Sequence, residues 1–400
     1  MSGSTVSRAR LSTGLSAFYG TYFGTVGVAL PFMPVWLAWR GLDPTEIGIV
    51  LGASFWIRVI ALPLVASYAD RSGRRRPLMR VLPLVALAAY AGLAFVSGVL
   101  AFAALALVIG ASFSALVPLG ESLALRGGET HGVDYGRVRL WGSVGFIVGS
   151  MGAGLLLSGA APSWILPAII AAVVLTTGAC AALPDLPRER PPARLGSALR
   201  LFTRPVFLLF LAACGTVQAS HVTYYGFGSI HWAAAGHSEG VVGALWAEGV
   251  IAEVLLFLLG TRLTARLRPF TLIALSGLAG VLRWSVLAST TDLAALVFVQ
   301  ALHAVTFGAA HLGAMAWLRQ NVPEELRTTA TSLYAATIAG VAFGATMPAA
   351  GALYETHGGG AFYFGVVLSA AGLLLAAAAG RLRGPTVPGG AHGRAPLRTR

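Results

Sequence analysis

Apolar residues gather in about a dozen long stretches, separated by short segments of charged residues, glycine and proline. A helix needs about 20 apolar residues to cross the hydrocarbon core of a membrane, which is close to the length of these stretches. Strands of a membrane barrel would alternate apolar and polar residues over about ten positions, and the sequence lacks that pattern. The pattern therefore predicts an all-α membrane protein with twelve helices, at 13–37, 46–68, 77–97, 100–124, 138–158, 163–183, 204–231, 239–260, 270–288, 292–318, 327–354 and 360–380.

The composition leaves almost no room for a soluble domain. Of 400 residues, 56% are hydrophobic and 11% are charged, and the mean hydropathy is +0.76. These values exclude a water-soluble globular domain of this length. The two cysteines, Cys180 and Cys214, both lie inside apolar spans. We therefore predict no disulfide framework, no metal site and no cofactor.

Positive charge follows the loops in a regular way. The net charge is +13, and the arginines concentrate in the two tails and in alternate loops rather than in one patch. This distribution argues against nucleic-acid binding. Because loops rich in arginine stay in the cytoplasm, we expect a multi-pass inner-membrane protein with both termini cytoplasmic.

An internal repeat divides the chain into two halves. Gly41 and Gly48 precede and begin the second span, and Gly236 and Gly243 hold the same positions 195 residues later at the eighth. The segment between the halves is rich in proline and arginine, as a linker would be. The predicted units are a six-helix bundle at 1–183, a cytoplasmic linker at 184–203, a second six-helix bundle at 204–380 and a disordered basic tail at 381–400.

The loop after the second span has a distinctive order of charges and glycine, Asp70-Arg71-Ser72-Gly73-Arg74-Arg75-Arg76. It resembles the signature between the second and third helices of the major facilitator superfamily, with Ala66 in place of the family's first glycine. In that family the segment locks helices of one half on the cytoplasmic side. The resemblance implies a cytoplasmic gate formed by Asp70, Arg71, Gly73 and Arg74. The plainer interpretation is a loop whose arginines only set the topology.

A closer resemblance runs over most of the chain. Its residues are Asp134-Tyr135-Gly136-Arg137-Val138-Arg139-Leu140-Trp141-Gly142-Ser143, Tyr224-Tyr225-Gly226-Phe227, Trp246, Glu253, Arg283-Trp284, His303 and His311. In these residues the chain resembles the phenylpropionate permease group of the same superfamily. The resemblance implies two pseudo-symmetric six-helix bundles and a monomer that imports a small aromatic monocarboxylate, such as 3-phenylpropionate, with a proton by alternating access.

The layout is more distantly similar to the lactose-permease type of proton symporter. There Glu121 and Arg139 match the sugar-binding carboxylate and arginine. Glu248, Arg283 and His303 match the functional carboxylate, arginine and histidine of the eighth, ninth and tenth helices. The family also has a proton-accepting glutamate three residues after the histidine, and here that position is Thr306. The proton site is therefore expected elsewhere.

Ionisable residues inside the spans are functional candidates, because each costs about 2.5 to 3.5 kcal/mol at the middle of a membrane. Glu253 is our candidate proton acceptor and Arg283 its expected partner, with a fixed structural ion pair as the alternative. Glu248 lies about 140° from Glu253 around the helix, so the two carboxylates cannot both face the cavity squarely. The full set is Arg58, Arg139, Arg283, Glu121, Glu248 and Glu253, with His221, His303 and His311 nearby.

Two groups of residues at helical spacing complete the candidate site. His303 and His311 fall within one arc of the tenth helix, so both could belong to a proton relay or could hydrogen-bond between helices. The candidate substrate contacts are Arg58, Glu121, Arg139, Tyr22, Gln218, His221, Tyr224 and Tyr225. Their aromatic rings could stack on a planar substrate while an arginine pairs its carboxylate, although single aromatic residues more often pack between helices.

Two alternatives remain open at this point. A proton-coupled sugar or nucleoside symporter would use Glu121 with Arg139. A protein of another class, a polytopic membrane enzyme or a receptor without transport, lacks support because the sequence has no His-Glu-x-x-His and no paired cysteine motif. Export antiporters of the superfamily have a Gly-Pro signature in the fifth helix, and the absence of proline there favours symport.

Overall fold

A computed structural model describes residues 7–72, 75–184, 186 and 203–381. Most of the predicted linker and nearly all of the predicted tail lie outside these residues. The described secondary structure is entirely helical. In the labels below, η1, η2 and η7 are short 3₁₀-helices, and η5 and η6 are π-helices.

The helices before the linker form the first bundle. They are α1 (Arg8–Trp39), α2 (Pro44–Ser72), α3 (Arg75–Gly92), η1 (Leu93–Phe95), α4 (Val99–Phe113), α5 (Leu116–His131), α6 (Tyr135–Leu157), η2 (Pro162–Trp164) and α7 (Ile165–Ala182). Within this bundle α1 packs on α6 and α7, and α4 packs on α2 and α3.

The helices after the linker form the second bundle. They are α8 (Pro205–Ala219), α9 (Val222–Ala234), α10 (Glu239–Leu258), α11 (Gly260–Arg266), α12 (Pro269–Ser289), α13 (Leu293–Ala301), η5 (Ala304–Ala309), α14 (Ala310–Asn321), α15 (Glu324–Ala336), η6 (Thr337–Ala342), α16 (Phe343–His357), η7 (Gly358–Ala361) and α17 (Phe362–Arg381). Here α12 and α8 both pack on α17.

The described residues contain eleven helical runs that are long and apolar enough to cross a membrane. The last run, Ala330–Arg381, has 52 residues and would be about 78 Å long if it were one straight helix. It turns back at Gly358, whose φ of 53° favours glycine, so α16 and α17 are separate spans. Twelve spans result, and each predicted span falls on one of them.

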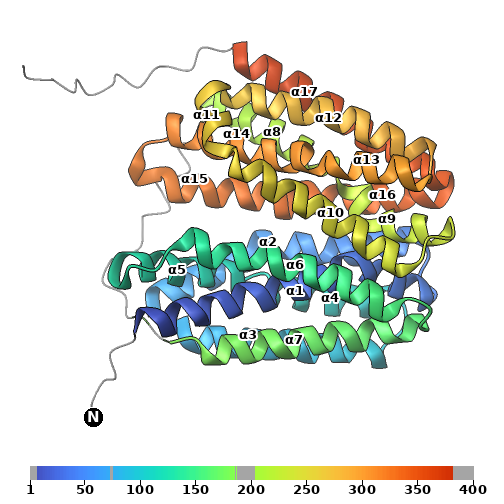
Figure 1. Ribbon diagram of the computed structural model, residues 1–400, viewed down its shortest axis with the longest axis horizontal. Coiled ribbons are helices and arrows are strands. Elements are labelled where there is room, and N and C mark those ends of the chain that lie inside the picture. Colours follow the sequence, from blue (N-terminus) through green and yellow to red (C-terminus); the bar gives the residue numbers. More distant parts are fainter. Residues whose placement is uncertain (1–6, 73–74, 185, 187–202, 382–400) are drawn as a thin grey trace, which may run out of the picture.

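The two bundles lie side by side, with α1 beginning and α17 ending at the same end of the molecule (Figure 1). The extensive contacts between the bundles pair α2 with α16 and α6 with α10. At Gly48 an added Cβ would lie 2.7 Å from the backbone oxygen of Met347, and at Gly154 it would lie 2.5 Å from that of Glu239. Both crossings lie near the loops opposite the chain ends, so the halves are closed together at that end.

The repeat between the halves is visible in the backbone. Gly41 and Gly236 both turn the chain with positive φ, 88° and 92°. Gly48 and Gly243 both sit at a crossing between the halves, where a side chain would collide with the facing backbone. The halves are therefore pseudo-symmetric, as the sequence spacing predicts.

Four of the described spans are interrupted along their length. The fourth breaks between α4 and α5 and the seventh between α8 and α9, whereas the tenth and eleventh pass through the π-helices η5 and η6. Interrupted helices within a membrane occur where backbone lines a cavity rather than lipid. The interruptions of the fourth, seventh and tenth spans surround the cavities described next.

Candidate functional site

Two cavities lie between the bundles, with volumes of about 430 Å³ and 180 Å³. The larger is lined mainly by α1, α2 and α4, and the smaller by α1, α6, α9, α10 and the tenth span. Five residues line both: Phe23, Val26, Leu30, Tyr225 and Phe307. The cavities therefore share a wall of mostly aromatic and aliphatic side chains.

Arg58 is the charged residue that lines the larger cavity. Its Nε donates to the backbone oxygen of Ser54 at 3.0 Å, and its guanidinium lies 4.4 Å from the ring centre of Phe55. Across the cavity Tyr22 stacks on Phe113, with ring centres 4.6 Å apart and an interplanar angle of 11°. Within the described part of the chain, no carboxylate lies within ion-pair distance of Arg58.

Arg139 lines the smaller cavity together with Glu253 and His303. Its guanidinium lies 4.3 Å from the ring centre of Phe23. The side chain passes over Gly142, where a Cβ would lie 2.6 Å from Nη1 of Arg139. Arg139 also has no carboxylate within ion-pair distance among the described residues, although Glu121 and Glu253 are near enough to interact with its charge.

Arg283 differs from both because it is fully buried and both of its terminal nitrogens have side-chain partners, although its Nε has none among the described residues. Its Nη1 donates to Oγ1 of Thr306 at 3.0 Å and lies 3.0 Å from Nδ1 of His303, and its Nη2 donates to Oε1 of Gln300 at 2.7 Å. Gln300 in turn donates from Nε2 to the hydroxyl of Tyr224 at 2.9 Å. The guanidinium also lies 4.9 Å from the ring centre of Tyr224 and 4.6 Å from that of Trp284. Arg283, on α12, therefore links that helix to α9 and to the tenth span.

The expected pair of Glu253 with Arg283 does not form in this structure. Glu253 instead lies beside His303, with Oε2 3.6 Å from Nε2. The ring of His303 thus stands between the carboxylate and the guanidinium, with one nitrogen toward each. The sequence placed the three residues in one region, but the side-chain partners depend on the packing of three helices.

His221 joins this network at the break between α8 and α9. Its Nε2 lies 3.1 Å from Oγ1 of Thr306, and its Nδ1 lies 3.1 Å from the backbone oxygen of Gln218. Gln300 was not among the site residues predicted from the sequence, and Thr306 was noted there only as a departure from a family pattern. The available signal was a polar amide three residues before His303, deep inside an apolar span.

Six candidate residues line neither cavity: Glu121, Gln218, His221, Glu248, Arg283 and His311. Gln218 is buried inside the second bundle, and its Oε1 has no hydrogen-bond partner among the described residues. Glu248 and Glu253 do face different surroundings, as their spacing predicts. His311 does not share a cavity with His303, because the wide π-helical turn of η5 rotates the residues that follow it. Its ring lies near Phe257, with centres 6.2 Å apart.

The predicted gate can be followed only in part. Arg71 is exposed in the last turn of α2. Gly73 and Arg74 lie outside the described residues, as does the side chain of Asp70. No group of histidine, cysteine or acidic side chains in the described ranges could hold a metal ion.

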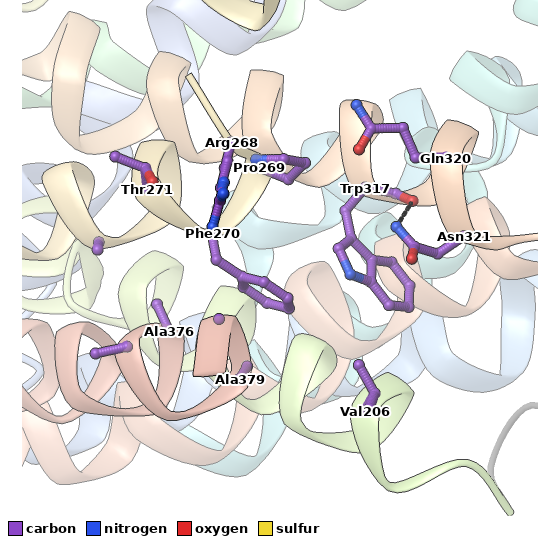
Figure 2. A pocket seen from close by; sticks show the side chains of 13 residues that line it. Val206, Arg268, Pro269, Phe270, Thr271, Trp317, Gln320, Asn321, Ala376 and Ala379 are labelled. Atoms are coloured by element: carbon purple, nitrogen blue, oxygen red, sulfur yellow. Dashed lines mark hydrogen bonds between the residues drawn. The ribbon is translucent and has the colours of Figure 1, made fainter. Parts of the chain in front are cut away.

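Another cavity, of about 560 Å³, is lined by none of these three arginines, and Figure 2 shows the side chains around it. It is bounded by α8, α12, α14 and α17 at the end of the second bundle where α17 ends. The indole of Trp317 and the ring of Phe270 border it, and Asn321 donates to the backbone oxygen of Trp317 at 3.0 Å. It belongs to one half only, so movement of one half against the other would not open and close it.

Comparison with known proteins decides the family. The MFS_1 like family model matches residues 12–366. The chain belongs to this family. It is therefore a multi-pass membrane protein and a secondary transporter of the major facilitator type rather than an enzyme, with a small molecule as its substrate.

Two relatives cover most of the chain. The probable 3-phenylpropionic acid transporter of Escherichia coli (strain K12) is 34% identical over 361 residues, which is 87% of this chain and 93% of the relative. The maltose permease of Geobacillus stearothermophilus is 30% identical over 328 residues, 80% of this chain and 82% of that one.

Solved structures confirm the fold. The nucleoside transporter NupG superposes with a TM-score of 0.80 at 16% identity, over 92% of this chain and 98% of that one. A bacterial homologue of the human lysosomal transporter Spinster, in an inward-facing conformation, superposes with a TM-score of 0.70 at 14% identity, over 94% and 96% of the two chains. At these identities the likeness concerns the twelve-helix fold alone.

Proposed function

We propose that this transporter imports a small aromatic monocarboxylate, such as 3-phenylpropionate, together with a proton. One observation carries the proposal: the cavities between the halves are lined by aromatic rings and hold two arginines without a carboxylate at ion-pair distance in the described residues. A guanidinium left without a counter-ion inside a membrane protein is costly, so an anionic substrate is the partner that this cavity lacks. The 34% identity to a probable 3-phenylpropionic acid transporter supports the same class.

Arg139 is the arginine that we assign to the substrate carboxylate. It lies in the smaller cavity, and no carboxylate oxygen competes for its guanidinium at hydrogen-bond distance in the described chain. The aromatic part of the substrate would then lie along the wall shared by the two cavities, against Phe23, Tyr225 and Phe307. Aromatic pairs of this kind contribute about 0.5 to 1.5 kcal/mol beyond burial of their surface. Tyr22 extends the same aromatic lining toward Arg58.

Glu253 and His303 form the proposed proton site. Both line the smaller cavity with Arg139, and their side chains lie 3.6 Å apart. A substrate carboxylate bound there would bring a second negative charge beside Glu253, and a proton shared by Glu253 and His303 offsets that charge. Substrate and proton therefore favour each other's binding. Arg283 keeps His303 oriented through Nδ1, and Tyr224 and His221 hold Arg283 and Thr306 in turn.

Transport would proceed by alternating access of a monomer in the inner membrane. The halves are closed at the glycine crossings opposite the chain ends. With both termini in the cytoplasm, this arrangement is the inward-facing state. Opening to the outside would separate the crossings of α2 with α16 and of α6 with α10 and close the other end, where Asp70, Arg71, Gly73 and Arg74 are the proposed gate.

A sugar or nucleoside symporter is the second candidate, and the maltose permease relative favours it. A neutral polyhydroxylated substrate needs carboxylate acceptors, and the similar family would supply Glu121 for that purpose. Glu121 lines neither cavity, and the larger cavity has no carboxylate among its lining residues. This geometry favours the acid over the sugar.

Uptake into proteoliposomes under an inward proton gradient tests the proposal. Wild-type protein should accumulate labelled 3-phenylpropionate, and Glu253→Gln should lose accumulation while still exchanging labelled for unlabelled acid across the membrane. Glu248→Gln serves as the comparison, because Glu248 is a half-buried carboxylate on the same helix that lines neither cavity. Failure of the wild type to take up the acid, together with uptake of maltose or a nucleoside, would refute the acid proposal. Loss of accumulation in Glu248→Gln alone would move the proton site.

A further inference from the structure

The two arginines of the central cavities do not occupy one site. Arg58 lines only the larger cavity and comes from α2, whereas Arg139 lines only the smaller and comes from α6. These two helices meet different partners in the second bundle, α16 and α10. The segment of α1 that carries Phe23, Val26 and Leu30 faces both cavities. The two guanidiniums therefore belong to different cavities that share one wall.

A simple charge count leaves Arg58 without a counter-ion. The charged residues lining the two cavities are Arg58, Arg139 and Glu253. In the proposed function the substrate carboxylate neutralises Arg139, and the transported proton neutralises Glu253. The charge of Arg58 then remains unpaired inside the membrane. A monocarboxylate whose carboxylate is bound at Arg139 has no second carboxylate for Arg58.

The protein itself does little to satisfy Arg58. Its Nε has a backbone acceptor, Ser54, but neither terminal nitrogen has a hydrogen-bond partner among the described residues. The hydroxyls of Tyr22 and Tyr90 are near enough to interact electrostatically with the guanidinium, although neither is hydrogen-bonded to it. A guanidinium offers two parallel N–H groups that suit an oxygen acceptor, and charged hydrogen bonds of this kind are about twice as strong as neutral ones.

We propose that the natural substrate carries a second oxygen group, at the ring position remote from its carboxylate side chain, and that Arg58 recognises it. The class is an aromatic acid with a hydroxyl or carboxylate on the ring. Tyr22 and Tyr90 line the same cavity as Arg58, and a phenol hydroxyl can donate to or accept from that oxygen. The inference rests on the proposed function, and it narrows the substrate class rather than replacing it.

The space available agrees with a substituted ring. The larger cavity alone, at 430 Å³, is within the range of about 300 to 1,000 Å³ that is usual for small-molecule sites. Its lining is mainly apolar; the polar residues are Thr25, Ser114 and Tyr225 and, close to Arg58, Tyr22, Tyr90 and Ser54. An unsubstituted phenyl ring would leave these groups and the guanidinium facing water.

Competition in proteoliposomes tests the inference. Unlabelled 3-phenylpropionate, 3-(4-hydroxyphenyl)propionate and 3-(4-carboxyphenyl)propionate compete with labelled 3-phenylpropionate for wild-type protein and for Arg58→Met. In the wild type, one or both ring-substituted acids should inhibit at about tenfold lower concentration than the parent acid, the ratio expected for one additional charged hydrogen bond. In Arg58→Met the ratio should fall to about one, and Arg58→Lys, which keeps the charge, should retain part of it.

Each outcome has a distinct meaning. Equal inhibition by the three acids in the wild type overturns the inference, and so does a ratio that Arg58→Met leaves unchanged. The comparison between the two substituted acids tells which oxygen group Arg58 recognises. If no acid is taken up and none competes, the proposed function itself fails. If Arg58→Met does not insert into the membrane, the wild-type ratio still tests the substrate class, and the ratio in Arg58→Lys tests the role of Arg58.

Discussion

The arginines of the two halves are held in opposite ways. In the second bundle Arg283 is fully buried and reaches Gln300, His303 and Thr306 within 3.0 Å. In the first bundle Arg58 and Arg139 are half-buried and held by rings and by one backbone oxygen. All three look alike in the sequence, as single arginines inside apolar spans.

This difference suggests that Arg283 has a structural role and that Arg58 and Arg139 have a binding role. Both terminal nitrogens of Arg283 already have protein partners and the guanidinium is fully buried, so a substrate that bound them would have to displace those partners. The terminal donors of Arg58 and Arg139 face the cavities and are available to an anion. The first bundle therefore supplies the proposed substrate contacts, and the second supplies the proposed proton site and the network that orients it.

Replacing Arg283 should have the largest effect on stability. Arg283→Met leaves Gln300, His303 and Thr306 without their shared donor, and each buried polar group left unsatisfied costs about 1 to 3 kcal/mol. We expect a fall of several degrees in the midpoint of thermal unfolding in detergent. Arg58→Met and Arg139→Met lose far fewer bonds and should unfold near the wild-type temperature, and Arg139→Met should also impair uptake of the acid.

The same thermal-unfolding measurement can also contradict the structural role of Arg283. Burying a guanidinium is itself costly, and Arg283→Met removes that cost. If Arg283→Met unfolds at or above the wild-type temperature, the burial penalty outweighs the network, and Arg283 is kept for transport rather than for a structural role. Arg283→Lys retains the charge without the planar fork and shows how much of the effect needs the geometry.

The sequence predicted the fold well because the membrane imposes it. Every backbone group in the hydrocarbon core must be bonded within its own helix, so a long apolar run becomes a span almost regardless of detail. The repeat was equally informative. Gly41 with Gly236, and Gly48 with Gly243, recur because each pair performs one task, a turn or a close crossing, that tolerates no side chain.

The site could be predicted only in outline. The sequence identified Glu253, Arg283 and His303 as functional candidates but not which side chains meet. Periodicity of 3.6 residues assumes a regular helix, and the π-helical turn at Ala304–Ala309 moves His311 away from the cavity that His303 lines. The break between α4 and α5 has a similar consequence, since Phe113 lines the larger cavity and Glu121, beyond the break, does not.

A substitution at Gly142 in the first bundle should have a smaller effect, and it tests whether the position of Arg139 matters for substrate binding. Gly142→Ala places a Cβ where Nη1 of Arg139 and the ring of Phe23 now lie, at 2.6 Å and 2.8 Å. Arg139 must move, and losing one charged hydrogen bond to the substrate should raise the KM for uptake about tenfold. The unfolding temperature should change little.

Gly152→Ala is the matched control on the same helix, because a Cβ there would meet no atom within 4 Å. Its KM should stay at the wild-type value. An equal rise in KM for both variants would mean that α6 itself is disturbed by alanine. No rise in Gly142→Ala would mean that the position of Arg139 does not matter for binding.

The smallest effect is expected at Thr306, whose hydroxyl is shared by the guanidinium of Arg283 and the imidazole of His221. Thr306→Val leaves Nη1 of Arg283 with only His303 and leaves Nε2 of His221 without a partner, whereas Thr306→Ser keeps the hydroxyl. Side-chain hydrogen bonds between membrane helices average about 0.6 kcal/mol, so Thr306→Val should lower the unfolding midpoint by only a degree or two. The two variants should be compared by thermal unfolding at one pH. A drop as large as that of Arg283→Met would show that the hydroxyl, rather than the guanidinium, holds the network together, and the contrast between the two halves would then rest on Thr306.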